Sequence, residues 1–404
     1  MNARKFFITT LFSILAAISV FAEKFEFKYY KDESFRILST VQEDVILNGR
    51  LHHKAEIVNR ISVKITDLLE DGTGVHDAHF MTSEKSVGAG SNGIYTWGEE
   101  YHSIFSRDKL GVYAISDEYF MPVVRDVPVF PDRELQIGDS WSYEGHEAHD
   151  LRGSFGVVTP FKVPFTAHYS YYGDTEKDGV KYQIIKANYN LYYDSPVPEN
   201  PSIEYPAKTM GFSDQTILWD SERGMIRSYS ERFRIQIETN YGDVLVFKGF
   251  ANAEVTDVAN VADPEMLEKV KQQITEMGIQ DTDVKATEKG ITISIENIQF
   301  KPESAILQPS ELEKLEKISE ILKAFPDNDL LVVGHTALAG TAESRQRLSE
   351  LRAASVADFL INQGAKDKKH IFTKGVGASQ PIASNDTPGG KAKNRRVEIT
   401  IMGQ

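Results

Sequence analysis

The sequence predicts a multidomain protein: a β-rich N-terminal half, either a sandwich or an open barrel, followed by a smaller α/β (α+β) domain. The length of 404 residues suits two or three domains. Aromatic composition marks a boundary, because every Tyr and Trp lies at or before Tyr241. The hydrophobic periodicity changes as well. Residues 233–238 alternate with the period of a strand, whereas the chain after residue 290 alternates strand patterns with helical ones.

The first 22 residues have the pattern of a secretory signal peptide. Arg4 and Lys5 form a basic start, Phe6 to Val20 is apolar, and Ala22 offers a small residue for cleavage. A spanning helix is disfavoured because the apolar run is short and charged residues follow at once. The chain has no cysteine for a disulfide or a lipid anchor. We therefore expect an exported protein without a transmembrane helix, located in the periplasm, with outer-membrane association as an option.

Residues 23–258 are predicted to be β-rich. A division near Leu151 gives a first domain at 23–150, and 151–258 is then either a second domain or the second half of the first. A membrane barrel is the alternative, but clustered prolines and charges on both strand faces favour the sandwich or open barrel. The clearest part is a meander, with strands expected at Thr216–Trp219, Met225–Glu238 and Val244–Val255.

A helical linker is predicted at 259–283, with Asp263 as N-cap and Gly278 after the last turn. The α/β domain then occupies 284–404 in the order β-α-β-α-β-β. Its expected elements are a strand at Ile291–Phe300, a helix beginning in a capping box at Ser310 and Glu313 and ending at Pro326, a buried strand at Asp329–Val333, a helix at Ser344–Gln363, a strand at Ile371–Gly375, a loop at Gly389-Gly390 and a last strand at Arg396–Met402.

Composition and motifs exclude several classes of function. The net charge is −14, so nucleic acid is an unsuitable partner. The stretch Gly88–Gly93 matches G-x-G-x-x-G as text, but no buried strand precedes it and no helix pattern follows, which favours a hairpin loop. No P-loop or nucleophile elbow is present. We expect no catalytic residue, no enzymatic activity and no cofactor.

Histidines raise the question of a metal site. His146 and His149 lie three residues apart, and His76 and His79 could add ligands if the fold brought the four together. A glycine and several prolines nearby indicate a loop or strand rather than a zinc-binding helix. We therefore predict loop histidines and no metal.

Arg352 is the residue that points most clearly to function. At 100° per residue it falls within an apolar arc, and Arg345 projects from the same side. The residues of that arc are Leu348, Leu351, Ser355, Val356 and Phe359. A buried arginine needs a carboxylate or several carbonyls around its guanidinium. Spacing alone leaves two alternatives, which are a structural ion pair or capped carbonyl and a fork that holds a ligand carboxylate.

Several separated motifs of the last module agree with one family. In order they are Gly334-His335-Thr336, Gly340, Leu348-Ser349, Arg352-Ala353, Val356, Gly375-Val376-Gly377, Gln380-Pro381-Ile382 and Asn394-Arg395-Arg396-Val397-Glu398-Ile399. This part, roughly residues 290–404, resembles the OmpA-like (OmpA/MotB C-terminal) domain family. The resemblance does not extend to the N-terminal half.

The resemblance implies a periplasmic domain that binds peptidoglycan non-covalently through the diamino acid of the stem peptide. Arg352 occupies the position that holds a carboxylate. The aspartate expected to hold the amine is Ala337 here, and the usual asparagine before the L-S-x-x-R-A motif is Arg345. Ala337 cannot accept a hydrogen bond from an ammonium group, and Arg345 would repel one. Thr336, Asn394 and Arg395 complete the candidate site.

The sequence therefore predicts an envelope protein that links the envelope to peptidoglycan through an altered pocket. The alternative is an envelope scaffold that no longer binds the wall and contacts other envelope proteins instead.

Overall fold

The computed structural model describes residues 22–87, 95–177, 179–198, 200, 202–257, 264–287, 289–301, 304–326 and 328–403. The predicted signal peptide, up to residue 21, and the predicted hairpin loop at Gly88–Gly93 lie outside these residues. None of the helices in the described part of the chain is both long and apolar enough to cross a membrane.

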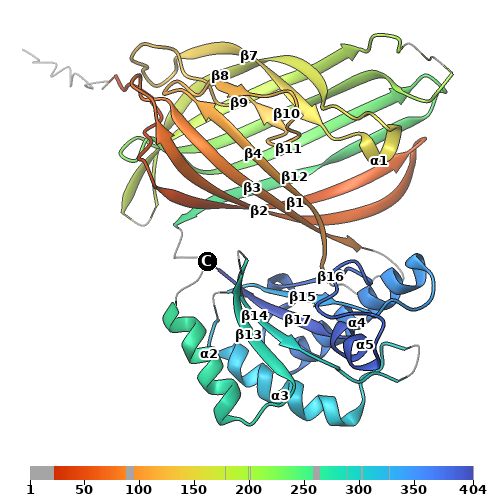
Figure 1. The fold of residues 1–404 in the computed structure, drawn as a ribbon. Coiled ribbons are helices and arrows are strands. Elements are labelled where there is room, and N and C mark those ends of the chain that lie inside the picture. Colours follow the sequence, from red (N-terminus) through yellow and green to blue (C-terminus); the bar gives the residue numbers. More distant parts are fainter. Residues whose placement is uncertain are drawn as a thin grey trace, which may run out of the picture.

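The N-terminal half is one continuous antiparallel sheet that curls strongly (Figure 1). Its order is β5-β4-β3-β2-β1-β12-β11-β10-β9-β8-β7-β6, so β1 pairs both with β2 and with the distant β12. The sequence predicts either a sandwich or an open barrel, and a single curled sheet is consistent with the open arrangement. The elements are β1 (Ser34–Leu47), β2 (Arg50–Leu68), β3 (Gly74–Val87), β4 (Tyr95–Arg107), β5 (Tyr113–Ile115), β6 (Val124–Arg125), β7 (Ser140–His149), α1 (Arg152–Phe155), β8 (Phe161–Lys177), β9 (Val180–Asp194), β10 (Pro206–Asp220), β11 (Met225–Thr239) and β12 (Val244–Asp257).

The predicted meander is present as β10, β11 and β12. Strand β10 begins ten residues earlier than expected, at Pro206, which is tolerated because it is the first residue of the strand. Strands β7 and β8 lie on either side of residue 151 and pair along the whole of β7. One sheet therefore crosses the proposed division, and the domain limits stay predictions.

Aromatic side chains fill the inside of the curled sheet. Trp219 is completely buried, and its ring centroid lies 4.8 Å from those of Phe27 and Phe130. Phe25 stacks on Phe130 at 5.2 Å. The early segment that carries Phe25 and Phe27 thus contributes to the core, although it precedes the first strand of the sheet.

The C-terminal part contains a mixed sheet in the order β13-β14-β17-β15-β16, with β15 and β16 parallel. Helices α3 and α4 cover one face and enclose a core of aliphatic side chains (Figure 1). The elements are α2 (Pro264–Glu276), β13 (Thr282–Thr287), β14 (Gly290–Ile295), α3 (Pro309–Lys323), β15 (Leu330–Gly334), α4 (Ala342–Asn362), the 3₁₀ turn η1 (Lys368–His370), β16 (Ile371–Gly375), α5 (Pro388–Asn394) and β17 (Val397–Met402).

Three local predictions in this part are wrong. Strand β14 ends at Ile295 instead of residue 300, because Asn297 adopts a left-handed φ of 51° that no strand can continue. Helix α3 starts earlier than the expected capping box, with Pro309 in its first turn. The expected Gly-Gly loop is the start of α5, where the Thr387 side chain accepts a hydrogen bond from the Gly390 amide.

The two parts of the chain meet along β4 and β16. These strands pair in parallel over two residues, with Phe372 beside Tyr95 and Thr373 beside Thr96. The contact buries a small apolar cluster between the curled sheet and the face of the C-terminal sheet that α3 and α4 leave uncovered. Its buried members are Val58, Tyr95, Trp97, Leu331, Val333, Phe372 and Met402. Paired backbone and shared apolar side chains therefore join the N-terminal half to the C-terminal part.

Candidate functional site

The loop after β15 carries Thr336 and Ala337, and backbone hydrogen bonds hold it in place. The Thr336 amide donates to the Gly377 carbonyl at 2.8 Å, and the Gly377 amide donates to the Ser349 hydroxyl at 2.9 Å. Gly377 has a left-handed φ of 52° and lies against the backbone of Arg345. Thr336, Gly377 and the first turns of α4 are thus brought together.

The N-terminal end of α4 packs closely on β15. A Cβ added to Gly334 would lie 2.2 Å from the Ser349 carbonyl oxygen, so only glycine fits at this approach. Thr341 caps the helix by accepting a hydrogen bond from the Ser344 amide. The distance between β15 and α4 is therefore set by direct backbone contact, and a side-chain cap fixes the start of the helix.

The buried face of α4 differs from the predicted arc. Its buried residues are Ser349, Ala353, Val356, Ala357 and Leu360. Leu351, which was expected to be buried, is 48% exposed. The arc is rotated by about one residue, because the small residues Ser349 and Ala353 allow β15 to approach on that side. Arg352 consequently lies at the margin of the buried face instead of its centre.

Arg352 is partly buried and makes one hydrogen bond to a described residue. Its Nε donates to the Ser304 carbonyl at 3.2 Å, and its guanidinium lies 4.7 Å from the centre of the Phe300 ring. Burial lowers the pKa of Arg352, and the positive charge of Arg395 lowers it further. Its contacts with described residues include no ion pair with a carboxylate. Of the five N–H donors of a guanidinium, one is used by the Ser304 carbonyl.

The Arg345 side chain folds back onto the loop that leads into α4. Its Nη1 donates to the Gly340 carbonyl, one turn before it in the loop that leads into α4. The side chain is half-buried, and its Nε has no partner among the described residues. Arg345 thus braces the loop that leads into α4.

Asn394 serves the fold of the site. Its Oδ1 accepts from the amides of Ile382 and Ala383, and its Nδ2 donates to the Ala383 carbonyl and to Asn385 Oδ1. These four bonds use the whole hydrogen-bonding capacity of the amide. Asn385 Oδ1 also accepts from the Leu338 amide at 3.0 Å, next to Ala337. Asn394 therefore positions the wall of the site and has no hydrogen bond left for a ligand.

Sequence reasoning missed a buried ionic group beneath this loop. Glu398 lies 2.7 Å from Arg396 Nε and 3.4 Å from His335 Nε2. Burial alone would raise the pKa of Glu398, but His335 and Arg396 lower it to about 2. Burial lowers the pKa of His335 despite that carboxylate. His335, Arg396 and Glu398 belong to two separate sequence motifs, and only the pairing of β15 with β17 shows that they meet.

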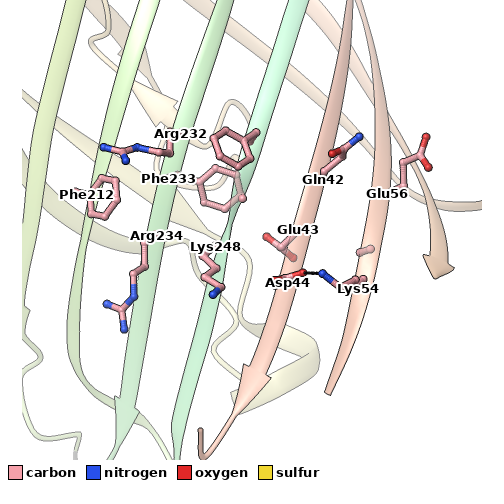
Figure 2. A pocket seen from close by; sticks show the side chains of 13 residues that line it. Gln42, Glu43, Asp44, Lys54, Glu56, Phe212, Arg232, Phe233, Arg234 and Lys248 are labelled. Atoms are coloured by element: carbon pink, nitrogen blue, oxygen red, sulfur yellow. Dashed lines mark hydrogen bonds and ion pairs between the residues drawn. The ribbon is translucent and has the colours of Figure 1, made fainter. Parts of the chain in front are cut away.

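A separate hollow of about 600 Å³ lies on the N-terminal sheet (Figure 2). It is bordered by β1, β2, β10, β11 and β12, and aromatic rings and charged side chains both line it. Burial raises the pKa of Glu43 to about 7, and the negative charge of Glu84 adds to the effect. None of the six predicted site residues lines this hollow.

The histidines that could have formed a metal site do not meet as the sequence alternative required. His76 is buried between Tyr29 and Phe105, with ring centroids 4.9 and 5.0 Å away. His149 instead pairs with Glu147 on β7 at 2.8 Å. His79 lies on the opposite face of β3 from the aromatic side chains around His76, because alternate residues of a strand face opposite ways.

Comparison with known proteins concerns the C-terminal part. Residues 299–395 match the model of the OmpA family. The chain is 41% identical over 126 residues to the probable lipoprotein YiaD of Escherichia coli, covering 30% of this chain and 57% of that protein. It is 43% identical over 104 residues to the peptidoglycan-binding protein ArfA of Mycobacterium tuberculosis, covering 26% of this chain and 32% of that protein. The chain thus spans less than two thirds of these relatives.

One solved structure is similar to the same part. An outer membrane protein from Borrelia burgdorferi is 38% identical, with a TM-score of 0.26, and the match covers 30% of this chain and 97% of that one.

Proposed function

Because residues 299–395 form an OmpA-family domain, we propose that this chain is an exported envelope protein that binds peptidoglycan non-covalently through the surface around Arg352. It acts in the periplasm as a structural link and has no catalytic role. A relative that is 43% identical to this part is named as a peptidoglycan-binding protein, which supports the assignment.

The observation that carries the proposal is the state of the Arg352 guanidinium. It is partly buried, hydrogen-bonded to a single carbonyl and without a carboxylate partner among the described residues. A carboxylate placed there would gain charge-assisted hydrogen bonds and relieve the repulsion with Arg395. Peptidoglycan stem peptides carry carboxylates of this kind, so the site suits their acidic groups.

The altered positions predict how the ligand differs from that of the family. The Ala337 side chain has no acceptor for an ammonium group, and Arg345 is a positive charge where the family usually has a neutral asparagine. Losing one charge-assisted contact costs on the order of 1.5–3 kcal/mol, which corresponds to roughly ten- to hundredfold in affinity. We therefore propose weak wall binding, in which the carboxylates of the stem peptide matter more than its amine.

Contacts between the two parts of the chain give the proposal a mechanical basis. Strand β4 pairs with β16. Glu100, which lies on β4, accepts hydrogen bonds from Lys289 at 2.6 Å and from Lys374 at 3.2 Å. The N-terminal sheet would thus be held against the wall-binding domain rather than tethered by the linker alone. Such a connection would keep the N-terminal half at a fixed position relative to the wall.

Sedimentation with purified sacculi tests the proposal. The chain without its signal peptide should pellet with sacculi. Arg352→Ala should lower the apparent affinity for sacculi at least about tenfold. Arg347→Ala is the matched control, because Arg347 is an exposed arginine of the same helix. Equal pelleting of all three proteins would show that Arg352 has no part in binding.

A non-wall-binding scaffold is the second candidate function. The observation that favours it is the pair Ala337 and Arg345, of which the latter is engaged with Gly340. On this alternative the parent stays in the supernatant, and the double variant Ala337→Asp with Arg345→Asn creates wall binding that the parent lacks. A parent that already pellets with sacculi contradicts the scaffold.

A further inference from the structure

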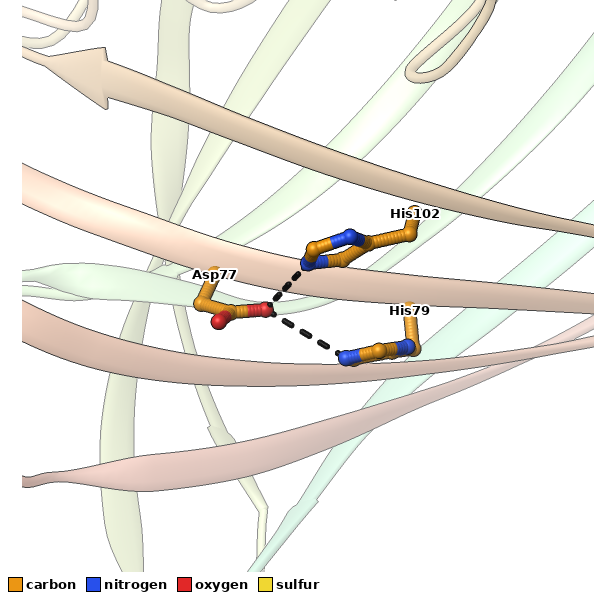
Figure 3. Close-up of side chains that lie close together, drawn as sticks. All are labelled: Asp77, His79 and His102. Atoms are coloured by element: carbon orange, nitrogen blue, oxygen red, sulfur yellow. Dashed lines mark hydrogen bonds and ion pairs between the residues drawn. The ribbon is translucent and has the colours of Figure 1, made fainter.

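Three potential metal ligands lie together on the outer face of the curled sheet, far in sequence from the wall-binding motif (Figure 3). Asp77 and His79 are two residues apart on β3, so their side chains project from the same face. His102 on β4 is the direct cross-strand partner of His79. The register of two neighbouring strands therefore places two imidazoles and one carboxylate side by side.

Two of the three separations between the ligand atoms are close to those of a coordination shell. Asp77 Oδ1 lies 2.9 Å from His102 Nε2 and 3.3 Å from His79 Nε2. All three ligand atoms lie within 4.8 Å of one another. In a tetrahedral zinc site with bonds of about 2.0–2.2 Å, neighbouring ligand atoms are roughly 3.3–3.5 Å apart. Small side-chain rotations would therefore suffice to place an ion between them.

The two imidazoles lie side by side, each with its Nε2 atom close to the same Asp77 oxygen. Their rings stack, with centroids 4.4 Å apart and an angle of 17° between the planes. Figure 3 shows both rings directed towards the Asp77 carboxylate. A carboxylate between two imidazoles lowers the electrostatic cost of bringing a divalent cation to the pair.

The site is open to solvent and to an incoming ion. The side chains of His79 and His102 are 58% and 48% exposed, and that of Asp77 is 33% exposed. Lys64 is the β2 neighbour of Asp77, but its amine lies 3.6 Å from Asp32, which offsets its charge. Three protein ligands on an open surface leave a fourth position for water or for a group from another molecule.

We propose that Asp77, His79 and His102 form a binding site for a divalent transition-metal ion such as Zn²⁺. Two imidazoles and one carboxylate without a thiolate suit Zn²⁺, Cu²⁺ or Ni²⁺ better than Ca²⁺ or Mg²⁺, which prefer oxygen ligands. The site lies in the N-terminal half, and its occupation does not depend on whether the C-terminal domain binds the wall.

Zinc titration of the chain carrying a histidine-free purification tag tests the proposal. Isothermal titration with ZnCl₂ should show one site that His79→Asn or His102→Asn weakens by more than about tenfold. Two controls keep the site: His168→Asn, which removes a lone exposed histidine on β8, and the double variant His52→Asn with His53→Asn, which removes another pair of adjacent histidines. Circular dichroism in a chelator verifies that every variant is folded.

The outcomes separate the proposal from simple hydrogen bonding between the three side chains. Loss of one zinc equivalent in the His79 and His102 variants, with both controls unchanged, supports the site. Absence of zinc uptake by the parent overturns it. So does uptake that survives His102→Asn or disappears with the His52 and His53 pair.

Discussion

Arg60 of β2 and Asp329, just before β15, form an ion pair across the junction of the two parts of the chain. Arg60 Nη2 lies 2.6 Å from Asp329 Oδ2, and its side chain is only 4% exposed. The guanidinium also stacks on Phe372 of β16, 3.9 Å from the ring centre. His370 completes the group by contacting Asp329 Oδ1 at 2.7 Å. This ion pair fixes the N-terminal sheet against the C-terminal part.

Arg60→Ala is expected to destabilise the protein by roughly 2–4 kcal/mol, because it removes the stacking on Phe372 and leaves the Asp329 carboxylate with one partner fewer. The measurement is urea unfolding followed by tryptophan fluorescence. Lys54→Ala is the control, since Lys54 pairs with Asp44 at the exposed surface and should change stability by less than about 0.5 kcal/mol. Equal effects of the two substitutions would contradict a stabilising role for Arg60.

The same group predicts a pH dependence. Its hydrogen bond to Asp329 raises the pKa of His370. A raised pKa means that the contribution of His370 is fully present below its unfolded pKa, about 6.5, and is lost as pH rises through the folded value. The free energy of unfolding should therefore fall with rising pH more steeply in the parent than in His370→Asn. Parallel curves for the two proteins would refute this linkage.

On the acid side the ion pair is lost through Asp329. Burial would raise its pKa, but the hydrogen bond to His370 and the charge of Arg60 lower it overall. Its contribution is present above the unfolded pKa of about 3.9 and disappears as pH falls through the lower folded value. Asp329→Asn should thus be less stable than the parent at neutral pH, and this difference should shrink in acid. A difference that is constant with pH would exclude the carboxylate as its source.

Glu43 is expected to destabilise the folded protein when it is charged. Its folded pKa is about 7, above the ordinary 4.5, so the folded state holds the proton more tightly than the unfolded one. Stability should decline as pH rises from about 4.5 to 7, and Glu43→Gln should gain on the order of 1–3 kcal/mol above pH 7. Chemical unfolding at pH 5 and pH 8 measures this gain, and a substitution equally stabilising at both pH values would contradict it.

Gly334→Ala tests the close packing of β15 on α4. The new Cβ would lie 2.2 Å from the Ser349 carbonyl, so the helix must shift, at an expected cost of about 1–3 kcal/mol. Gly389→Ala is the matched control, because a Cβ there has nothing within 4 Å. Thermal unfolding should separate the two variants clearly. If both behave like the parent, the backbone contact between Gly334 and Ser349 is not tight in solution.

The strong local patterns of the C-terminal part were predictable from sequence. The apolar run of β15 and the long helix α4 appear where expected, and the resemblance to the OmpA-like family is confirmed by the family match over residues 299–395. The predicted buried face of α4 was wrong by about one residue. Small residues such as Ser349 and Ala353 are buried because the backbone of β15 comes close to them, and hydrophobicity does not indicate such a contact.

Relationships between distant strands could not be predicted. The pairing of β4 with β16 joins residues 95 and 372, and the register of β3 with β4 brings His79 to His102. Neither follows from local periodicity, since a shift of one residue would turn each side chain to the opposite face. The same limit hid the contact of Arg352 with Ser304, which depends on how the segment before α3 packs against α4.

The most direct test of the central proposal is the affinity of the chain for purified peptidoglycan with and without the Arg352 guanidinium. Sedimentation over a range of sacculus concentrations should give saturable binding by the parent and by Arg347→Ala, and binding at least about tenfold weaker for Arg352→Ala. Blocking the carboxylates of the stem peptides by amidation should weaken binding of the parent as much as Arg352→Ala does. A parent that remains in the supernatant, or one whose binding is unchanged by Arg352→Ala, would contradict the proposed wall-binding site.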